Sequence, residues 1–218
     1  SLHDALPICF FLRAIQKAGT KYVFFMQLKI NEIFYSIQGE GRWTGRPMVF
    51  LRLAGCSVSG CHIRDVCDTD WSHGKAATLD GIAAQLEAFP TGAPVSITGG
   101  EPTDHDLSPL MDILKGREIH METSGVREVD YNLDWLTVSP KTVGYKQRAG
   151  GGLKIIVRPE WTWKEVEALE KDSRFSYKYL QPMTSGSLPL NTAQVISMVL
   201  ERPEWNLSTQ AHRVWKLR

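Results

Sequence analysis

Three cysteines within twelve residues are the feature of the sequence best suited to chemistry. They lie in the segment Cys56-Ser-Val-Ser-Gly-Cys61-His-Ile-Arg-Asp-Val-Cys67, directly after a predicted strand at residues 48–54. Thiolates bind soft metals, and three of them on one loop can surround a single metal centre. An odd number of closely spaced cysteines is a poor disulfide framework. The segment therefore indicates a metal site.

The identity of the metal stays open on these residues alone. A structural zinc ion takes four ligands, and His62 or His73 could complete the set. A four-iron cluster held by three cysteines leaves one iron open to a further ligand. Unligated cysteines are the third alternative. The cysteine segment by itself favours the iron–sulfur cluster, with zinc as the main rival.

A second motif, Ile97-Thr98-Gly99-Gly100-Glu101-Pro102, ends a predicted strand at residues 94–98. Paired glycines let the backbone come close to a ligand, and the carboxylate of Glu101 can bind an ammonium group. The alternative is an ordinary turn between a strand and a helix. Because the motif follows the cysteine segment by some thirty residues, we interpret it as part of a binding site.

Together these two segments resemble the radical S-adenosylmethionine superfamily. The resemblance implies a [4Fe-4S] cluster held by Cys56, Cys61 and Cys67, whose open iron chelates the methionine end of S-adenosylmethionine. It also implies that the Gly-Gly-Glu motif meets the amino group of that cofactor. The spacing here is Cys-x4-Cys-x5-Cys, whereas the superfamily's usual spacing is Cys-x3-Cys-x2-Cys. The loop must therefore be wider than usual.

Further segments narrow the resemblance to one family, the 7-carboxy-7-deazaguanine synthases. The similarity runs from about Met26 to the C-terminus, and the ordered series of segments is much more specific than any one of them. The segments are Ile33-Phe34-Tyr35-Ser36-Ile37-Gln38-Gly39-Glu40-Gly41, Phe50-Leu51-Arg52-Leu53-Ala54-Gly55-Cys56, Cys67-Asp68-Thr69, Glu122-Thr123-Ser124-Gly125, Val138-Ser139-Pro140-Lys141, Lys154, Gln181-Pro182 and Ser208-Thr209-Gln210-Ala211-His212.

The resemblance implies a radical ring contraction. In this family S-adenosylmethionine is cleaved to a 5′-deoxyadenosyl radical, which removes hydrogen from 6-carboxy-5,6,7,8-tetrahydropterin. The ring contracts and ammonia leaves, which gives 7-carboxy-7-deazaguanine for deazapurine nucleosides such as queuosine. The family also requires Mg²⁺ and regenerates S-adenosylmethionine in each turnover.

The matching positions can be given roles that make chemical sense. Arg52 can clamp the substrate carboxylate with two hydrogen bonds, although a surface ion pair is the alternative. The hydroxyl of Thr69 suits Mg²⁺, which prefers oxygen ligands. The remaining substrate contacts are assigned to Gln38, Glu40, Gln210 and His212, and those to S-adenosylmethionine to Gly99, Gly100, Glu101, Ser124, Ser139 and Gln181. Lys141 is assigned a structural role, and no catalytic side chain is expected beyond the cluster and cofactor.

Strands and helices alternate along the chain and must position these residues. The patterns predict helices beginning at Thr78 and near 107–114, 163–170 and 191–200. They predict strands at residues 28–37, 48–54, 94–98, 118–122, 135–138, 153–157, 177–180 and 205–209. This alternation predicts an α/β fold, an open partial β/α barrel of about six mostly parallel strands with the radical S-adenosylmethionine core. Ligands gather at the C-terminal ends of such strands, where the polar motifs fall.

Composition limits the classes of function. The 218 residues are 43% hydrophobic and 22% charged, which suits one domain, predicted at residues 26–218. Residues 1–25 are expected to be a non-native or disordered extension, and Cys9 is left out of the chemistry. The net charge of +1 argues against nucleic acid as a partner, and no apolar run reaches the roughly 18 residues of a membrane span. The reduced cysteines favour a cytoplasmic location.

The expected partners are a small pterin substrate and an electron donor such as flavodoxin, with a homodimer implied by the family alone. One rival is another radical S-adenosylmethionine protein, such as a glycyl-radical activase that binds a large protein. The Gln-Gly-Glu segment at Gln38 and the Gln-x-His segment at Gln210 favour the pterin instead. The other rival is a zinc-binding module without catalysis.

Overall fold

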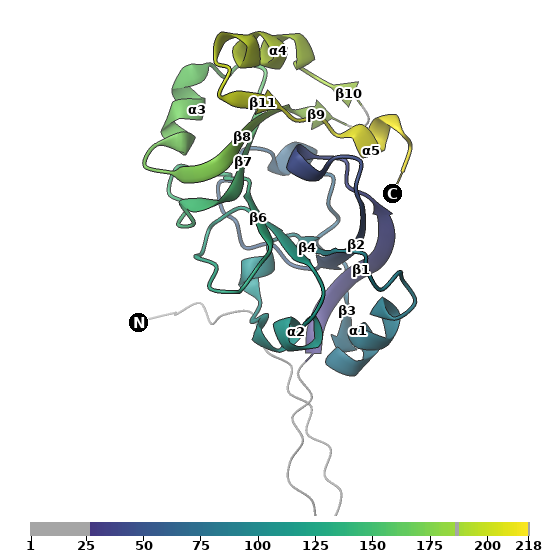
Figure 1. Cartoon of the computed structure of the whole chain (residues 1–218). Coiled ribbons are helices and arrows are strands. Elements are labelled where there is room, and N and C mark those ends of the chain that lie inside the picture. Colours follow the sequence, from purple (N-terminus) through teal and green to yellow (C-terminus); the bar gives the residue numbers. More distant parts are fainter. Residues whose placement is uncertain (1–26, 186–187, 218) are drawn as a thin grey trace, which may run out of the picture.

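A curved sheet of nine strands forms the centre of the molecule (Figure 1). The computed structural model describes residues 27–185 and 188–217. The strand order is β11 (Trp205–Leu207), β8 (Arg174–Pro182), β7 (Ala149–Val157), β6 (Trp135–Val138), β5 (Ile119–Thr123), β4 (Val95–Gly99), β2 (Pro47–Leu53), β1 (Gln27–Ile37) and β3 (Lys75–Thr78). Neighbours from β11 to β2 are parallel, whereas β1 pairs antiparallel with both β2 and β3.

Helices connect the strands and cover the outside of the sheet (Figure 1). Thr78 caps the first of them by accepting a hydrogen bond from the Gly81 amide, and Thr162 and Glu165 form a capping box on the third. The α-helices are α1 (Leu79–Leu86), α2 (Ser108–Ile113), α3 (Trp163–Glu170), α4 (Thr192–Glu201) and α5 (Ala211–Val214). Three short 3-10 helices are η1 (Gly41–Trp43), η2 (Arg64–Val66) and η3 (Pro102–Asp104), and a small sheet pairs β9 (Thr184–Ser185) with β10 (Leu188–Pro189).

Two large clusters of the core lie between the sheet and these helices, and a third, small cluster consists of Phe34, Met48 and Phe50. On β7, Leu153, Ile155 and Val157 are fully buried and pack with residues of α3 and α4. Since successive side chains on a strand point to opposite faces, Lys154 points to the other face of the sheet. The same alternation on β2 directs Arg52 to the inner face of the curve, together with Met48 and Phe50 of the small apolar cluster.

The predicted fold class is confirmed, because the sheet is open, mostly parallel and flanked by helices. The nine strands of the sheet exceed the barrel of about six that was predicted, although eight of them correspond to the eight predicted strand ranges. One addition is β3, whose sequence Lys-Ala-Ala-Thr has little preference for a strand and which is formed by pairing with β1. The predicted extension at residues 1–25, with Cys9, lies outside the described residues.

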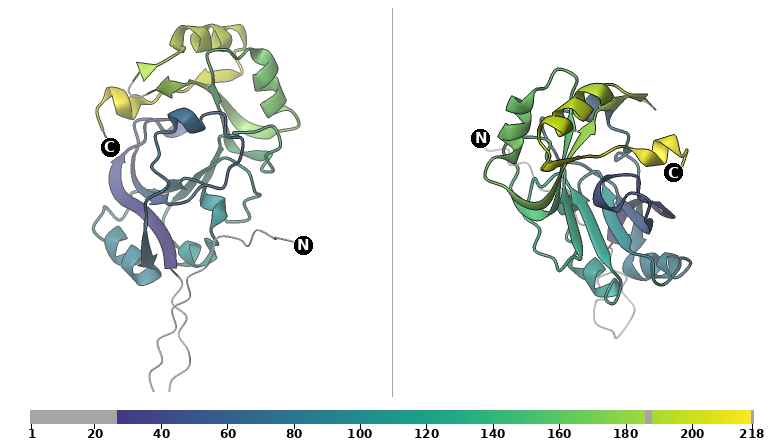
Figure 2. Two further views of the ribbon diagram at one scale, coloured as in Figure 1. Left: turned by 180° about the vertical axis from the view of Figure 1, so that it is seen from behind. Right: turned by 45° about the horizontal axis from the view of Figure 1, so that its top comes forward.

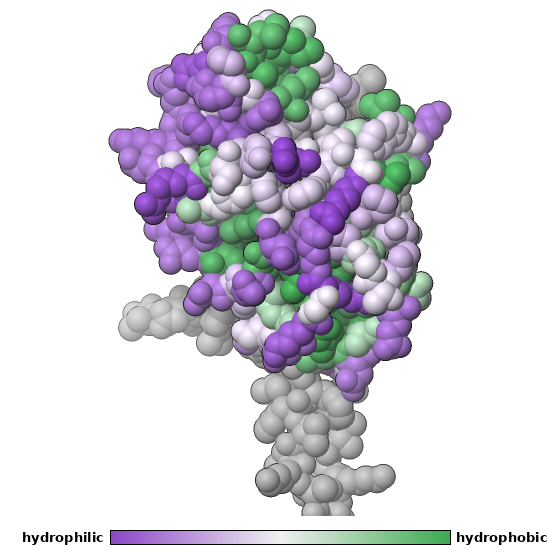
Figure 3. Space-filling model, in the orientation of Figure 1, coloured by the Kyte–Doolittle hydropathy of each residue, from purple (hydrophilic) through white to green (hydrophobic). Residues whose placement is uncertain are grey.

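The surface is polar over most of the face seen in Figure 3. A green patch at the top lies over α4, where Ile196 and Leu200 are exposed. Among the described residues, no helix has the length and apolar character that a membrane crossing requires.

Candidate active site

A cavity of about 440 Å³ lies inside the curve of the sheet, where the parallel strands end. This is the edge at which open α/β folds bind their ligands. The cysteine loop, residues 55–74, forms one part of the wall, and the segment 208–217 forms another. In the left view of Figure 2 the loop, in blue, lies within the arc of the strands, and α5 lies at its rim. Residues far apart in the sequence therefore meet in one place.

Fourteen of the fifteen residues predicted to form the site line this cavity. They come from the ends of strands, from the cysteine loop and from the segment 208–217. They are Gln38, Glu40, Arg52, Cys56, Cys61, Cys67, Thr69, Gly99, Gly100, Ser124, Ser139, Gln181, Gln210 and His212.

Glu101 is the exception, since its side chain is fully buried and does not line the cavity. Its carboxylate accepts hydrogen bonds from the amide and hydroxyl of Thr103 at 3.0 and 2.7 Å and from the Thr123 hydroxyl at 2.6 Å. It also accepts from the amide of Ser124 at 2.8 Å and from the Ser124 hydroxyl. In this arrangement Glu101 joins the ends of β4 and β5 and orients Ser124, which does reach the cavity.

The three cysteines carry free thiols that all face the cavity. Burial raises the pKa of the Cys56 thiol, so a positively charged centre is needed to stabilise its thiolate. Within residues 27–185 and 188–217, no group of three His, Cys, Asp or Glu side chains is arranged to hold a metal ion. The donor set fits a thiolate-bound cluster, provided that the loop tightens when the metal binds.

The histidines that could complete a zinc site are engaged elsewhere. The two ring nitrogens of His62 each lie 3.0 Å from a backbone carbonyl oxygen, of Lys141 and of Ile156. The ring also contacts Trp161, with 4.5 Å between centroids. His73 is exposed and lies 2.7 Å from Asp70. Neither histidine lines the cavity, so the fourth zinc ligand does not come from them in this arrangement.

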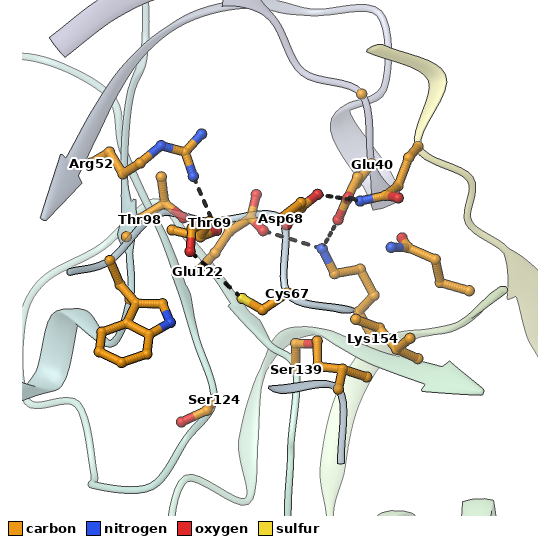
Figure 4. Close-up of a pocket in the computed structure, with 18 of the residues that line it drawn as sticks. Glu40, Arg52, Cys67, Asp68, Thr69, Thr98, Glu122, Ser124, Ser139 and Lys154 are labelled. Atoms are coloured by element: carbon orange, nitrogen blue, oxygen red, sulfur yellow. Dashed lines mark hydrogen bonds and ion pairs between the residues drawn. The ribbon is translucent and has the colours of Figure 1, made fainter. Parts of the chain in front are cut away.

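An ion triad, in which Lys154 is buried and the two carboxylates are partly buried, forms part of the cavity wall (Figure 4). Lys154 on β7 lies between the carboxylates of Glu40 and Glu122, with 3.2 Å to Glu122 Oε2. Gln38 Nε2 donates to Glu122 at 2.8 Å, and Gln210 Nε2 donates to Glu40 at 2.9 Å. Burial is the largest single influence and raises the pKa of both carboxyls, but the Lys154 charge and the hydrogen bonds from Lys154, Gln38 and Gln210 together lower both. Burial likewise opposes the charge of Lys154, and the two carboxylates outweigh it and raise its pKa. All three groups are therefore charged at neutral pH.

These lowered pKa values predict how stability depends on pH. A carboxyl whose pKa is lowered by folding stabilises the protein above its unfolded value, about pH 4.5, and loses that contribution as the pH falls through the folded value. Replacing Glu122 with glutamine should therefore lower the free energy of unfolding at pH 7 and matter progressively less below pH 4.5. Urea unfolding of both proteins across this range measures the difference. The exposed Glu87 provides the control: Glu87→Gln should unfold as the wild type does at pH 7. A Glu122→Gln effect that is constant from pH 7 to pH 3 would contradict the prediction.

Arg52 and Thr69 lie together on the opposite wall (Figure 4). Arg52 Nη1 lies 3.4 Å from Thr69 Oγ1, and Arg52 Nε donates to Glu32 at 3.0 Å. The Arg52 side chain is 24% exposed and lines the cavity, whereas its ion-pair partner Glu32 is not among the lining residues. The guanidinium is held in a fixed direction and faces the space that a ligand would fill.

The two glycines of the second motif are required by the neighbouring backbone. A Cβ on Gly99 would lie 2.2 Å from the Leu53 carbonyl oxygen, and one on Gly100 would lie 2.0 Å from the Gly55 carbonyl oxygen. Gly99 also has φ +145°, a backbone conformation that side chains rarely adopt. The glycines therefore let β4 approach the start of the cysteine loop.

Replacing Gly99 with alanine should consequently destabilise the protein by more than about 2 kcal/mol, because strain at φ and displacement of the strand end add. Urea unfolding measures this loss. A Cβ on Gly92 meets no atom within 4 Å, so Gly92→Ala is the matched control and should unfold as the wild type does. Equal stability of the two variants would show that the close approach is not required.

Several cavity residues had no predicted role. They are Asp68, Trp71, Thr98, Glu122, Lys154 and Arg213. The sequence did contain an indication of a role for Lys154, because it is the one charged residue in the apolar run Leu153 to Val157. Lys141, assigned a structural role, lines the cavity and donates to Ser139 Oγ at 2.7 Å. Burial lowers the pKa of Lys141.

Comparison with known proteins gives consistent results from sequence and from structure. A scan against protein-family models finds no match. A 7-carboxy-7-deazaguanine synthase of Bacteroides thetaiotaomicron is 35% identical over 204 residues, which cover 88% of this chain and all of that protein. The Caulobacter vibrioides and Escherichia coli proteins of the same name are each 34% identical, and each match covers 86% of this chain and 98% of the relative.

A solved structure agrees with these relatives. The crystal structure of QueE from Escherichia coli superposes with a TM-score of 0.66 and 32% identity, covering 85% of this chain and 95% of that one. The relatives match over nearly their whole length, and the cavity brings together the segments on which the sequence resemblance rests. The chain belongs to the 7-carboxy-7-deazaguanine synthase family.

Proposed function

We propose that this chain converts 6-carboxy-5,6,7,8-tetrahydropterin into 7-carboxy-7-deazaguanine and ammonia with S-adenosylmethionine as cofactor. The observation that carries the proposal is the cavity on which fourteen predicted residues from distant segments of the sequence converge, in a chain of this family. The substrate and the product plus ammonia have the same overall oxidation level, so no net oxidant is required.

The cysteine side of the cavity suits the cofactors. Cys56, Cys61 and Cys67 would hold a [4Fe-4S] cluster, with S-adenosylmethionine contacted by Gly99, Gly100, Ser124, Ser139 and Gln181. When bound, the cluster and S-adenosylmethionine supply the carbon radical that removes hydrogen from the substrate. The buried Glu101 would act at this end by fixing Ser124, and its direct contact with the cofactor amino group stays a prediction. Thr69 offers a hydroxyl oxygen to Mg²⁺.

The other side of the cavity suits a pterin. Arg52 would pair with the substrate carboxylate, since a guanidinium matches a carboxylate in shape and charge. Gln38, Glu40, Gln210 and His212 surround the space beside it and present both donors and acceptors to the ring edges. Lys154 keeps Glu40 and Glu122 ionised, so that both remain hydrogen-bond acceptors for ring N–H groups. A cavity enclosed in this way also limits quenching of a radical by solvent.

The remaining proposals concern the whole enzyme. An electron donor such as flavodoxin would reduce the cluster, and the enzyme would act as a homodimer in the cytoplasm, as one domain over residues 26–218. The support for these proposals is the family to which the chain belongs. Membership of this family argues against the two alternatives, a glycyl-radical activase and a zinc-binding module, and the assay below tests both.

The test combines metal analysis with a product assay. Protein reconstituted without oxygen is incubated with the tetrahydropterin, S-adenosylmethionine, Mg²⁺ and a reductant, and the products are analysed by mass spectrometry. About four irons per chain and formation of 7-carboxy-7-deazaguanine are expected. A reaction without S-adenosylmethionine is the control. Iron-loaded protein that cleaves S-adenosylmethionine without forming this product would refute the proposed substrate, and stoichiometric zinc without iron would refute the enzyme class.

A further inference from the structure

The segment 208–217 is attached at its N-terminal end to the turn that follows β1, residues 39–41. The Ser208 hydroxyl accepts a hydrogen bond from the Gly41 amide at 3.0 Å and donates to Gln181 Oε1 at 2.7 Å. The Ala211 amide donates to the Gly39 carbonyl oxygen at 2.9 Å. These contacts fix where the segment begins, because they bind it to elements at both ends of the sheet.

The same segment is attached to the cysteine loop through Asp68. Arg213 Nη2 lies 2.6 Å from Asp68 Oδ2, and Gln210 Nε2 lies 3.0 Å from the same oxygen. Gln210 Nε2 also donates to Glu40 Oε1 at 2.9 Å. Asp68 is thereby joined through Gln210 to Glu40 and Lys154 (Figure 4). One chain of polar contacts links the cysteine loop, the segment 208–217 and the ion triad.

Apolar packing does not hold this part of the loop. Cys67 and Asp68 are exposed, Thr69 is only partly buried, and η2 contains no buried residue. A stretch with few buried contacts opens at low free-energy cost, so its position depends on its polar contacts. Among the polar contacts of Asp68 described above, the one with Arg213 is an ion pair. The Arg213 side chain is 20% exposed and the Asp68 side chain 43%. Partial burial makes such a contact stronger than a fully exposed pair.

We propose that Arg213 is a positioning residue, which holds Asp68 and with it Cys67 and Thr69 at the correct distance from the substrate contacts on the segment 208–217. This inference rests on the proposed function for its kinetic consequence, though not for its structural one. Without the guanidinium, the Asp68 and Glu40 carboxylates would lie on either side of the Gln210 amide with no cation at Asp68. Repulsion would then move the loop and the segment apart, and the cavity would widen where Thr69 and Gln210 face each other.

Arg213→Met tests the charge, because methionine keeps much of the side-chain length without the guanidinium. Arg213→Lys restores the charge and should restore the function. Arg202→Met is the matched control, since Arg202 forms an ion pair of the same 2.6 Å length with Glu167 away from the cavity. All three variants are made in the full chain.

Two measurements are needed. Amide hydrogen exchange of the protein without substrate should become about tenfold faster at residues 66–72 and 208–217 in Arg213→Met, and at neither segment in Arg202→Met. In the product assay, KM for the tetrahydropterin should rise about tenfold in Arg213→Met while kcat changes less than about twofold, and Arg213→Lys should recover most of the loss.

The outcomes separate the two proposals. Wild-type exchange rates in Arg213→Met would overturn the positioning role, whatever the substrate. Faster exchange over the whole chain, or an equal effect of Arg202→Met, would also overturn it, because the effect would then be one of general stability. If the wild type does not convert the pterin, the proposed function fails, and the exchange measurement still decides the role of Arg213. Faster exchange at the two segments with unchanged KM would refute the kinetic consequence.

Discussion

Replacing Cys61 with alanine is expected to abolish both iron binding and product formation. Three thiolates are the protein's contribution to a four-iron cluster with one open iron, and two cannot hold it in place. Among the described residues the cavity offers only Cys56 and Cys67 in addition. The loop histidine, His62, is engaged with two backbone carbonyls and is not positioned to substitute. Iron and sulfide per chain after anaerobic reconstitution, followed by the product assay, measure the loss.

Cys9 supplies the matched control, because it was left out of the predicted chemistry. Cys9→Ala should bind as much iron as the wild type and form product at the same rate. Iron retained in Cys61→Ala would show that the ligand assignment is wrong. Iron lost in Cys9→Ala would show that a residue outside the cysteine loop takes part.

Replacing Lys154 with methionine should have the second largest effect. Two carboxylates, Glu40 and Glu122, would then face one buried space without a cation, and removal of one partner from a buried ion group destabilises proteins by about 3–5 kcal/mol. One carboxyl would take up a proton and cease to accept hydrogen bonds from the substrate ring. We expect kcat/KM for the tetrahydropterin to fall more than about 100-fold, which corresponds to about 2.7 kcal/mol of lost transition-state stabilisation. Urea unfolding and the product assay measure the two effects.

A control variant and a second substitution show whether the effect of Lys154→Met arises from the lost charge or from the lost side-chain packing. Lys178 is also partly buried and ion-paired, with Glu170, but it lies outside the cavity, so Lys178→Met should leave kcat/KM unchanged. Adding Glu122→Gln to Lys154→Met removes one of the two negative charges that repel each other. The double variant should recover part of the stability but not the activity. A double variant no more stable than Lys154→Met would show that the loss arises from packing instead.

Local sequence patterns were sufficient for much of the fold. The strands at 48–54, 94–98 and 135–138 were predicted to within a residue or two, since β-branched residues bounded by turns are a local signal. The short strand β3 was not predicted, because Lys-Ala-Ala-Thr becomes a strand only when β1 lies beside it. The alternation of strands with helices also predicted that the strands run parallel. It did not predict which strands are neighbours in the sheet.

For the site, too, some features could be predicted from the sequence and others could not. By itself the sequence determined which residues could do the chemistry: three cysteines on one loop, a Gly-Gly-Glu turn and a series of polar segments at strand ends, because residue type and short spacing are readable without a structure. Only the tertiary structure decided how they act together. It buried Glu101 behind the wall, placed Lys154 between Glu40 and Glu122, and joined Arg213 to Asp68. The ion pairs of Lys154 and Arg213 connect residues from different strands and loops, 32 to 145 positions apart. They depend on strand order and sheet curvature, which no local pattern of the sequence contains.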